Sequence, residues 1–221
     1  MRAMILAAGR GTRMGRLTQS TPKPLLDLNG ESLIERHLKR LAAAGVDDVV
    51  INLSYLGERI REALGDGERY GVRIRYSQEP ARPLETAGGI VKALPLLGDK
   101  PFLVVNSDVV SDFDYAALEI GALSGVLVLV PNPAHHPGGD YGVDGASRLT
   151  HAEPKYTFAG ISLLSPTLFA GLPPGRRPLT EVFDAGIAAR SVGAVVHSGL
   201  WIDVGTPERL EHTRSVVRAG A

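Results

Sequence analysis

The sequence predicts an α/β protein built on a doubly wound, mostly parallel sheet. In the first half, short apolar runs alternate with amphipathic segments, which is the pattern of repeated βαβ units. The run over 102–105 is continuously apolar, as is typical of a parallel strand that is buried on both faces. With 221 residues, of which 44% are hydrophobic and 22% charged, we expect one domain over 1–221.

The N-terminal half is expected to start with a strand over 3–6, directly before a glycine-rich turn. Ser32 and Glu35 form a capping-box pattern, and apolar residues then recur at helical spacing until Gly45. These signals predict a helix that begins after Ser32 and ends near Gly45. The remaining elements of this half are expected to be a strand over 48–52, a helix over 56–64 and a strand over 72–76.

The middle and C-terminal parts continue the alternation. Thr86 is expected to cap a helix over 87–94 that Pro95 ends, and Thr206 suits the N-cap of a last helix. The segment 131–154 is rich in Gly, Pro, His and Asp, which predicts loops and short strands that cover a site. The other expected elements are strands over 102–106, 125–130, 158–163 and 192–197, and helices over 179–189 and 207–219.

The composition of the chain argues against several classes of binding partner and of metal site. Lys plus Arg number 24 and Asp plus Glu number 24, so no global field attracts nucleic acid or an anionic membrane. The chain has no cysteine, which excludes disulfides and thiolate metal clusters. No apolar stretch approaches the ~20 residues that span a bilayer, and the run after Arg2 is too short for a secretory signal. We expect a cytoplasmic monomer or weak dimer that binds small molecules, and neither nucleic acid nor membranes.

A glycine-rich turn follows the first expected strand. Gly9 and Gly11 can bring backbone N–H groups against a phosphate chain, and Thr12 and Arg13 come directly after them. A Walker A loop is excluded because no Gly-Lys-Ser/Thr follows, and Met14 stands where the dinucleotide fingerprint has its third glycine. Alone, such a pair of glycines marks a turn more often than a site.

A lysine between two prolines comes next. Pro22 and Pro24 have φ angles fixed near about −65°, and Thr21 and Lys23, which each precede a proline, are expected to be extended. A cation on so stiff a backbone is pre-organised to stabilise charge that develops in a transition state. The alternative is a solvated lysine in a proline-rich loop, which would be favoured if this motif stood alone.

The segments 9–14 and 22–25 together resemble the signature of the sugar-phosphate nucleotidylyltransferases. Three further segments resemble motifs of that family, in the family's order: the base-binding segment 83–89, the first metal carboxylate in 106–108 and the second in 201–207. This resemblance covers nearly the whole chain and implies a Rossmann-like, GT-A-like sheet with an inserted sugar-binding β region. It also implies a nucleotide-binding part over about 1–110 and a sugar-binding part over about 111–205.

The resemblance implies roles for single residues. Lys23 and Arg13 would be catalytic by stabilising charge on the phosphates. Asp108 and Asp203 would hold Mg²⁺, which prefers carboxylate and phosphate oxygens. The nucleotide would contact Ala8, Gly9, Gly11, Thr12, Arg13, Lys23, Glu79, Glu85, Thr86 and Gly88. The sugar would contact Asn106, Gly142, Glu153 and Gly160.

The expected reaction is transfer of a uridylyl group from UTP to a sugar 1-phosphate, with release of pyrophosphate. The segments 92–99 and 132–136 and the pair Glu85-Thr86 resemble N-acetylmuramate 1-phosphate uridylyltransferases, which implies an acceptor from the recycling of cell-wall peptidoglycan sugars. Chemistry alone leaves the base open, because an ionised Glu79 can accept the N3–H of uracil or the N1–H of guanine. A guanylyl- or thymidylyltransferase is therefore an alternative.

Two other functional classes and several residues stay open. Asp112-Phe113-Asp114 is an Asp-x-Asp that would suit a metal-dependent glycosyltransferase, and a silent nucleotide-sugar binding protein is a further alternative. His135 and His136 are expected to be solvated or to contact the sugar, since adjacent loop histidines lack the spacing of a helical zinc site. Lys155 has either a sugar contact or a surface position, and Trp201 is expected in the core.

Overall fold

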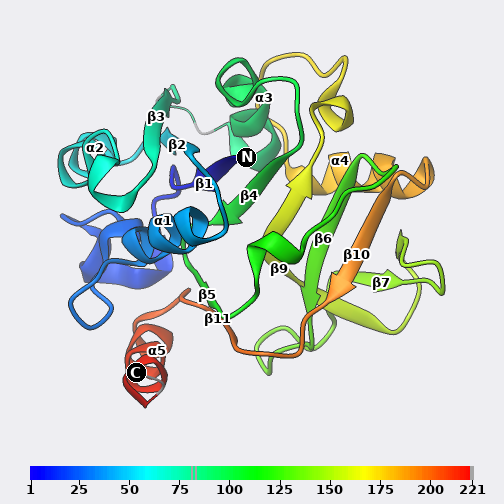
Figure 1. Cartoon of the computed structure of the whole chain (residues 1–221). Coiled ribbons are helices and arrows are strands. Elements are labelled where there is room, and N and C mark those ends of the chain that lie inside the picture. Colours follow the sequence, from blue (N-terminus) through cyan, green and yellow to red (C-terminus); the bar gives the residue numbers. More distant parts are fainter. Residues whose placement is uncertain (81, 83, 220–221) are drawn as a thin grey trace.

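A nine-stranded sheet forms the centre of the computed structural model, which describes residues 1–80, 82 and 84–219 (Figure 1). Seven strands follow one another in the order β10-β6-β9-β4-β1-β2-β3, and β7 and β8 extend the sheet from β9. The strands of this sheet are β1 (Arg2–Leu6), β2 (Asp48–Leu53), β3 (Arg73–Gln78), β4 (Phe102–Asn106), β6 (Gly125–Val130), β7 (Tyr141–Val143), β8 (Leu149–Thr150), β9 (Lys155–Leu164) and β10 (Val192–Val196).

Among the seven strands of this order, most neighbours run parallel. β1 pairs in parallel with β2 and with β4, and β2 pairs in parallel with β3, so their carboxyl ends meet at one edge. β9 runs antiparallel to both β4 and β6. The predicted α/β fold with a mostly parallel sheet is confirmed. The direction of β9 could not be predicted, because a continuous apolar run looks the same in either direction.

Helices cover both faces of the sheet. The helices are α1 (Leu33–Ala43), α2 (Gly57–Leu64), α3 (Glu85–Leu97), α4 (Leu179–Ala188) and α5 (Pro207–Ala219). Leu38 of α1 lies in a core with Ile5 of β1, and α2 packs into the same core. Ile90 of α3 lies in a second core with Phe102 of β4, and α4 packs there. This is the three-layer arrangement that buries a parallel sheet on both faces.

The first helix forms for the reasons that the sequence suggests. Ser32 Oγ accepts the N–H of Glu35 at 3.4 Å, and Glu35 Oε2 accepts the N–H of Ser32 at 2.9 Å, which completes the capping box. Ile34, Leu38 and Leu41 recur on one face of α1 and are fully buried. The cap and the apolar face therefore fix where α1 begins and which side of it meets the sheet.

The expected start of α3 is wrong. α3 begins at Glu85, and its N-cap residue is Leu84 rather than Thr86. The carbonyl of Arg177, from a distant loop, accepts the N–H of Ala87 at 3.1 Å. A backbone carbonyl from a distant part of the chain thus accepts the hydrogen bond that a local side-chain cap was expected to accept. The residues next to Thr86 in the sequence do not indicate this contact.

The expected end of α3 is also wrong. Pro95 lies inside the helix, on its exposed side, and α3 continues to Leu97. A proline removes one backbone hydrogen bond but leaves the others in place. The N–H of Gly98 donates to the carbonyl of Leu94 at 2.9 Å and closes the last turn. With only one turn after Pro95, the loss is small enough for the helix to persist.

A second, two-stranded sheet was not expected from the sequence. β5 (Val109–Ser111) pairs antiparallel with β11 (Trp201–Asp203), and Asp203 lies opposite Val109. The N–H of Val204 donates to the carbonyl of Asp108 at 2.8 Å and extends this pairing by one residue. Two segments that are far apart in the sequence therefore lie side by side, which brings Asp108, directly before β5, next to Asp203, the last residue of β11.

The last helix lies apart from the sheet, beside the N-terminal loop segment (Figure 1). Thr206 Oγ1 accepts the N–H of Arg209 at 3.3 Å, so the predicted N-cap is confirmed. Leu210 of α5 packs into a small core with Met14 and Val204. This third core ties the C-terminal helix to the loop that follows β1.

The segment 131–154 contains loops and the short strands β7 and β8, as predicted. The long sheet passes from the predicted nucleotide part into the predicted sugar part through the pairing of β4 with β9. The division of the chain near residue 110 stays a prediction. Across the described ranges, every helix is too short or too polar to cross a membrane.

Candidate active site

A cavity of about 400 Å³ lies at the carboxyl ends of β1, β2 and β4, and we call it the strand-end cavity. Leu6 and Asn106 are the last residues of β1 and β4, and Asn52 lies one residue before the end of β2. This edge is where open α/β sheets bind their ligands. The lining residues are Leu6, Ala8, Gly9, Gly11, Thr12, Arg13, Lys23, Pro24, Asn52, Glu79, Glu85, Thr86, Asn106, Ser107, Asp108 and Gly205.

The fold brings most of the predicted site residues to this one cavity. The predicted nucleotide-binding residues that line it are Ala8, Gly9, Gly11, Thr12, Arg13, Lys23, Glu79, Glu85 and Thr86. The predicted metal ligand Asp108 and the predicted sugar-binding residue Asn106 line it too. Pro83, the first residue of the segment that resembles a base-binding motif, lies outside the described residues.

The glycine turn packs closely against Lys23. Gly11 has a φ angle of +61°, and a Cβ atom added to it would lie 3.0 Å from the Cβ atom of Lys23. A side chain at this position would both strain the backbone and crowd the lysine. Thr18 Oγ1 donates to the carbonyl of Gly11 at 3.0 Å and holds the turn in place. The turn therefore requires glycine for a reason that involves Lys23 directly.

Lys23 is buried and forms an ion pair with Asp108. The residue is 9% exposed, and its Nζ atom contacts Oδ2 of Asp108. The expectation of an extended backbone at Lys23 is wrong, because Lys23 begins a short 3₁₀ helix, η2 (Lys23–Leu25). Pro24 fits the second position of this helix, since the first N–H groups of a helix have no internal partner to lose. The turn aims the lysine at the end of β4.

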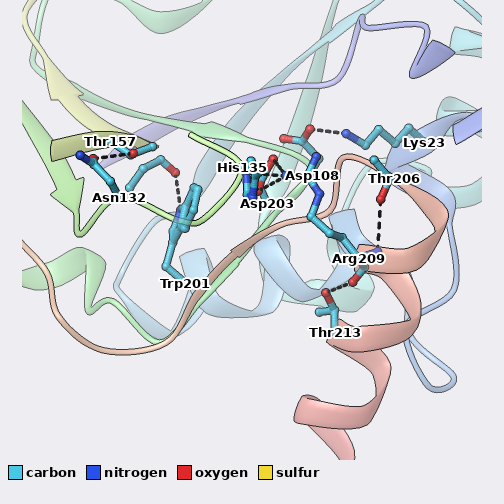
Figure 2. A network of polar contacts seen from close by, with 11 residues as sticks. Lys23, Asp108, Asn132, His135, Thr157, Trp201, Asp203, Thr206, Arg209 and Thr213 are labelled. Carbon is cyan, nitrogen blue, oxygen red and sulfur yellow. Dashed lines mark hydrogen bonds and ion pairs between the residues drawn. The ribbon is translucent and has the colours of Figure 1, made fainter. Parts of the chain in front are cut away.

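Asp203 is held by a second cation. Arg209 Nη1 donates to both carboxylate oxygens of Asp203 at 2.7 Å. His135 Nε2 lies 3.0 Å from Asp203 Oδ1 and 2.6 Å from Arg209 Nη1. Figure 2 shows His135, Asp203 and Arg209 converging close to the pair formed by Lys23 and Asp108. Neither His135 nor Arg209 was assigned to this carboxylate from the sequence.

The two predicted metal ligands have the chemistry that Mg²⁺ requires. Asp108 and Asp203 supply hard carboxylate oxygens, and the contact between Val204 and Asp108 keeps their backbones adjacent. Both side chains are partly exposed, at 29% and 24%, so a ligand can reach them. The described residues contain no group of three or more acidic or histidine side chains that could hold a metal ion by themselves. Substrate phosphates and water would therefore complete an octahedral shell.

Glu79 belongs to a buried chain of hydrogen bonds. Asn52 Nδ2 donates to Glu79 Oε1 at 2.7 Å, and Asn52 Oδ1 accepts the N–H of Ala7 at 2.7 Å. The N–H of Leu84 donates to Glu79 Oε2 at 3.4 Å. Glu79 is 6% exposed, so it is a fixed part of the cavity wall rather than a solvated acid. Asn52 was missed, although an asparagine in an otherwise apolar strand end was a visible signal.

The segment after Leu84 is strained where it meets the cavity. Glu85 has a φ angle of +57°, a region that non-glycine residues rarely adopt. Its carboxylate forms an ion pair with Arg176. Glu85 and Thr86 line the strand-end cavity, and both also line a second cavity beside it. Such backbone strain clusters at ligand sites, which agrees with the predicted binding role.

The second cavity, of about 470 Å³, has a wall of aromatic and apolar side chains, and we call it the aromatic cavity. It shares Asn106 with the strand-end cavity. Burial raises the pKa of Tyr141 to about 12, so its hydroxyl stays protonated and can donate to a ligand. The lining residues are Glu85, Thr86, Asn106, Asp140, Tyr141, Phe158, Pro178, Leu179, Thr180 and Phe183. Apolar faces with a few polar groups are typical of a ligand pocket.

A third cavity, of about 340 Å³, meets the strand-end cavity at Arg13, Asn106 and Asp108, and we call it the histidine cavity. Its lining residues are Arg13, Asn106, Asp108, Val109, His135, His136, Thr157, Phe158, Ala159, Gly160, Trp201 and Asp203. Trp201 therefore borders a cavity instead of lying only in the core, and its Nε1 donates to the carbonyl of Ala159 at 2.9 Å. Asn106 is common to all three cavities.

Three predicted binding residues are not among the lining residues of these three cavities, within the part of the chain that the structure describes. A Cβ on Gly88 would lie 2.2 Å from the carbonyl oxygen of Gly175, and one on Gly142 would lie 2.0 Å from that of Ala152. Glu153 is exposed. Close packing explains both glycines without a ligand, and the three binding roles stay predictions.

Gly160, the other predicted sugar-binding glycine, differs from Gly142. Gly160 lines the histidine cavity and has a φ angle of +72°. A Cβ at this position would lie 2.6 Å from Asn106 Nδ2. Gly160 thus leaves the room that the side chain of Asn106 needs at the junction of the cavities.

Both aspartates of the Asp-x-Asp segment make hydrogen bonds within the fold. Asp112 Oδ1 lies 2.7 Å from His197 Nε2, and Asp114 Oδ1 accepts the N–H of Ala116 at 2.9 Å as the cap of a short helical turn. Neither aspartate lines the three cavities. Lys155 is likewise absent from their described linings, so the surface position fits it better than a sugar contact.

Comparison with known proteins decides the family. The model of the family described as "Nucleotidyl transferase" matches residues 2–143. This chain belongs to that family. The N-acetylmuramate alpha-1-phosphate uridylyltransferase of Neisseria meningitidis serogroup B is 47% identical over 99% of this chain and 99% of its own length. The protein of the same name from Caulobacter vibrioides is 33% identical over 93% of this chain and 92% of its own length.

Other relatives are named for the transfer of other nucleotides, or show likeness in the fold alone. The mannose-1-phosphate guanylyltransferase catalytic subunit beta of Dictyostelium discoideum is 31% identical over 94% of this chain, which covers 62% of that relative. A solved structure described as a putative glucose-1-phosphate thymidylyltransferase from Bacillus anthracis has a TM-score of 0.87 at 19% identity, over 99% of this chain and 96% of that one. The predicted family, fold class and enzyme class are confirmed.

Proposed function

We propose that this protein transfers a uridylyl group from UTP to N-acetylmuramic acid 1-phosphate, giving UDP-N-acetylmuramic acid and pyrophosphate. The strand-end cavity carries the proposal, because the glycine turn, Lys23 and Asp108 meet there beside Asp203. The 47% identity to the Neisseria relative over nearly the whole chain supports the choice of base and sugar. Salvage of cell-wall sugars in the cytoplasm is part of the same proposal.

The reaction is an in-line displacement at phosphorus. An oxygen of the acceptor's phosphate forms a bond to the α-phosphorus of UTP. The bond from that phosphorus to the oxygen that bridges to the β-phosphate breaks, and the bridging oxygen leaves with the electron pair as part of pyrophosphate. The attacking oxygen is already an anion, so no general base is required. Catalysis then consists of positioning and of neutralising charge.

Two basic side chains are proposed to act on the triphosphate. Lys23 would neutralise charge on the α-phosphoryl group, and Arg13 would bind the departing β- and γ-phosphates. Asp108 and Asp203 would hold Mg²⁺, whose chemistry there is charge neutralisation on phosphate oxygens. The ion pair of Lys23 with Asp108 supports a pre-organised role for the lysine, because a buried cation that is held beside a proposed metal ligand needs little rearrangement.

Glu79 is the proposed contact to the base. Its Oε1 atom accepts from Asn52, and Oε2 has one long contact, from Leu84, so Oε2 can still accept the N3–H of uracil. Guanine could offer its N1–H to the same oxygen. The 31% identity to a guanylyltransferase from Dictyostelium keeps guanylyl transfer as the second candidate.

The aromatic cavity is the proposed place of the acceptor sugar. It shares Asn106 with the strand-end cavity, which supports a sugar there reaching an α-phosphate in the other cavity. The faces of Tyr141 and Phe158 suit the apolar face of a pyranose ring, and Asp140 and Thr180 offer polar partners.

One experiment separates these possibilities. Four nucleoside triphosphates are each mixed with a panel of sugar 1-phosphates in the presence of Mg²⁺, and pyrophosphate release is measured. We expect the fastest release with UTP and N-acetylmuramic acid 1-phosphate. Preference for GTP would replace the uridylyl assignment with the second candidate, and absence of pyrophosphate release with every pair would contradict the proposed function.

A further inference from the structure

Asn52 is a buried polar residue on an inner strand of the sheet. It lies on β2, which pairs with β1 on one side and β3 on the other. The residue is 4% exposed and lines the strand-end cavity. The proposed reaction gives Asn52 no role, although a buried amide in a mostly apolar strand requires partners for both of its polar atoms.

The orientation of the Asn52 amide is fixed by a backbone group. The N–H of Ala7 can only donate, so its partner at 2.7 Å is the oxygen Oδ1 of Asn52. The amide nitrogen Nδ2 then lies on the other side, where it donates to Glu79 Oε1 at 2.7 Å. Glu79 must therefore accept at Oε1, and it cannot turn this oxygen toward a ligand without losing the bond.

Helix α3 leaves space for this contact. Gly89 lies in the interior of α3, where glycine stabilises a helix less than alanine does. A Cβ atom added to Gly89 would lie 2.6 Å from Glu79 Oε1 and 3.2 Å from Asn52 Nδ2. The helix therefore has glycine at a position where a methyl group would push the two side chains out of place.

The fixed orientation of Glu79 limits the bases that it can accept. Among the described residues, the other contact of its carboxylate is a long one, at 3.4 Å from the N–H of Leu84 to Oε2. Oε2 can therefore still accept a hydrogen bond, whereas a carboxylate has no proton to donate. Uracil offers N3–H to such an oxygen. In cytosine, N3 is an acceptor without a proton, so its lone pair would face those of the carboxylate.

We propose that Asn52 is the positioning residue for base selection: it holds Glu79 as an acceptor for the pairing edge of the base, so that the site takes UTP and rejects CTP. The inference rests on the proposed function and deepens it, because it assigns the choice between two pyrimidines to a residue that acts through Glu79. Asn52 also connects the base with the phosphates, since its other partner, Ala7, lies close before Gly9 of the glycine turn.

The first test removes the donor. Asn52→Ala is compared with wild type in steady-state kinetics with UTP or CTP, N-acetylmuramic acid 1-phosphate and Mg²⁺. We expect the KM for UTP to rise about tenfold and the KM for the acceptor to stay within about twofold, since the bond that fixes the carboxylate is lost. The ratio of kcat/KM for UTP to that for CTP should fall about tenfold or more, an effect that a merely structural role would not produce.

A paired substitution tests the direction of the hydrogen bond. Asn52→Asp replaces the donor by an acceptor and sets two carboxylates against each other, so the use of UTP should fall further than in Asn52→Ala. Adding Glu79→Gln to Asn52→Asp restores one donor and one acceptor, and the amide oxygen is then free for the N3–H of uracil. This double variant should use UTP about fivefold better than Asn52→Asp alone.

Gly89→Ala disturbs the contact without removing either partner. Alanine favours the helix, and the Glu79 carboxylate is the end of a flexible side chain that can move aside. The melting temperature should therefore change little, while the KM for UTP should rise about fivefold. An unchanged KM for UTP in this variant would contradict the requirement for space at Gly89.

A matched control is Asn132→Ala, which removes another asparagine with hydrogen bonds of its own. Asn132 Nδ2 donates to the carbonyls of Pro137 and Lys155, and Asn132 is not among the described lining residues of the strand-end cavity. Its loss should leave the preference for UTP over CTP unaltered, whatever it does to the melting temperature. Calorimetry with analogues of UTP and CTP that cannot be cleaved measures the same preference without turnover.

The outcomes separate the inference from the function on which it rests. If the wild-type protein turns over normally and a folded Asn52→Ala protein keeps its preference for UTP over CTP, the role of Asn52 is overturned while the proposed function stands. A double variant that is no better than Asn52→Asp alone would overturn it too, as would a wild-type protein that uses CTP as well as UTP. Absence of turnover with every pair would contradict the proposed function, and binding of the two analogues would then decide the role of Asn52 by itself.

Discussion

Asn52 donates a hydrogen bond to Glu79 across the ends of β2 and β3, with 2.7 Å between Nδ2 and Oε1. Both side chains are buried, and the carbonyl oxygen of Asn52 accepts the N–H of Ala7. The residue proposed to contact the base is thus tied to the start of the glycine turn. A shift of one of these groups would move the others, because each has its partner fixed in the interior.

Glu79→Gln should weaken the use of UTP only modestly. The amide has one accepting oxygen in place of two, so it can accept from Asn52 or from the N3–H of uracil but not from both, and the KM for UTP should rise about fivefold. Steady-state kinetics with UTP as the varied substrate measure this. Glu58→Gln, on the exposed surface of α2, is the control and should behave as wild type. A Glu79→Gln protein with unchanged KM for every nucleotide would remove Glu79 from the base contact.

Lys23→Ala should lower kcat on the order of 10²–10³-fold and change the KM for UTP much less. The role proposed for Lys23 is stabilisation of charge that develops in the transition state, by analogy with a donor of an oxyanion hole. Lys92→Ala, on an exposed face of α3, is the matched control and should keep full activity. Melting curves are needed beside the kinetics, because the variant leaves Asp108 without its ion pair. Near-normal turnover in a folded Lys23→Ala protein would contradict the catalytic role.

Asp108→Asn and Asp203→Asn should each abolish most activity, and the double variant should be little worse than either. Residues that serve one metal ion are non-additive, whereas independent defects multiply. The adjacency of the two backbones, through Val204 and Asp108, is the structural reason to expect a shared ion. A double-mutant cycle on kcat/KM at limiting and saturating Mg²⁺ measures the coupling. Fully multiplicative losses with an unchanged Mg²⁺ dependence would argue against a shared site.

Acid should destabilise the fold through His37. Burial, the largest cause, lowers the pKa of this side chain to about 4, and the nearby guanidinium groups of Arg36 and Arg40 act in the same direction, against an opposing effect of Asp108. The unfolded chain binds a proton near the ordinary pKa of about 6.5, so between pH 6.5 and pH 4 the unfolded state holds more protons and stability falls as the pH falls.

For this group alone, the free energy of unfolding should be about 2 kcal/mol lower at pH 5 than at pH 7.5. Urea unfolding at the two pH values measures the change. His37→Asn, whose amide lies near the position of Nδ1 and can still meet the hydroxyl of Tyr115, should lose that part of the pH dependence. The same acid sensitivity in wild type and variant would show that other groups are responsible.

Gly88→Ala should lower the melting temperature more than it affects nucleotide binding. A Cβ at this position would lie 2.2 Å from the backbone oxygen of Gly175, which cannot simply swing aside, and overpacking of this kind costs about 1–3 kcal/mol. The N–H of Gly88 is also committed, since it donates to the carbonyl of Arg177 at 3.2 Å. Gly9→Ala is the control for stability, because a Cβ there meets nothing within 4 Å. An unchanged melting temperature together with a raised KM for UTP would favour the predicted binding role instead.

The parts of the fold that depend on neighbouring residues were predictable from the sequence. The capping box of Ser32 and Glu35 and the N-cap of Thr206 are such cases, because both partners of each contact lie within one helical turn. The start of α3 was not, since the carbonyl that caps it belongs to Arg177, which is distant in the sequence. Local propensity cannot report a partner that only the tertiary fold supplies.

The site residues also differ in whether the local sequence could predict them. The residues of the glycine turn and Lys23 carry a recognisable pattern, and the structure brings them to one cavity. Arg209 and His135 were not connected with Asp203, because an arginine on a helix and a histidine in a loop are ordinary surface residues until the chain brings them together. Asn52 could have been found, since a polar residue within a strand expected to be buried requires a partner.

The pairing of β5 with β11 also affects the order in which the protein can become functional during synthesis. β5 leaves the ribosome well before β11 and α5, which follow it in the chain. A nascent chain can therefore pair β1 with β4, whose last residues line the strand-end cavity, before the segment that contains Asp203 has been synthesised. Affinity for the divalent cation that the two aspartates are proposed to hold should then appear abruptly, when β11 docks on β5, and a cation bound there would resist the fraying of β11.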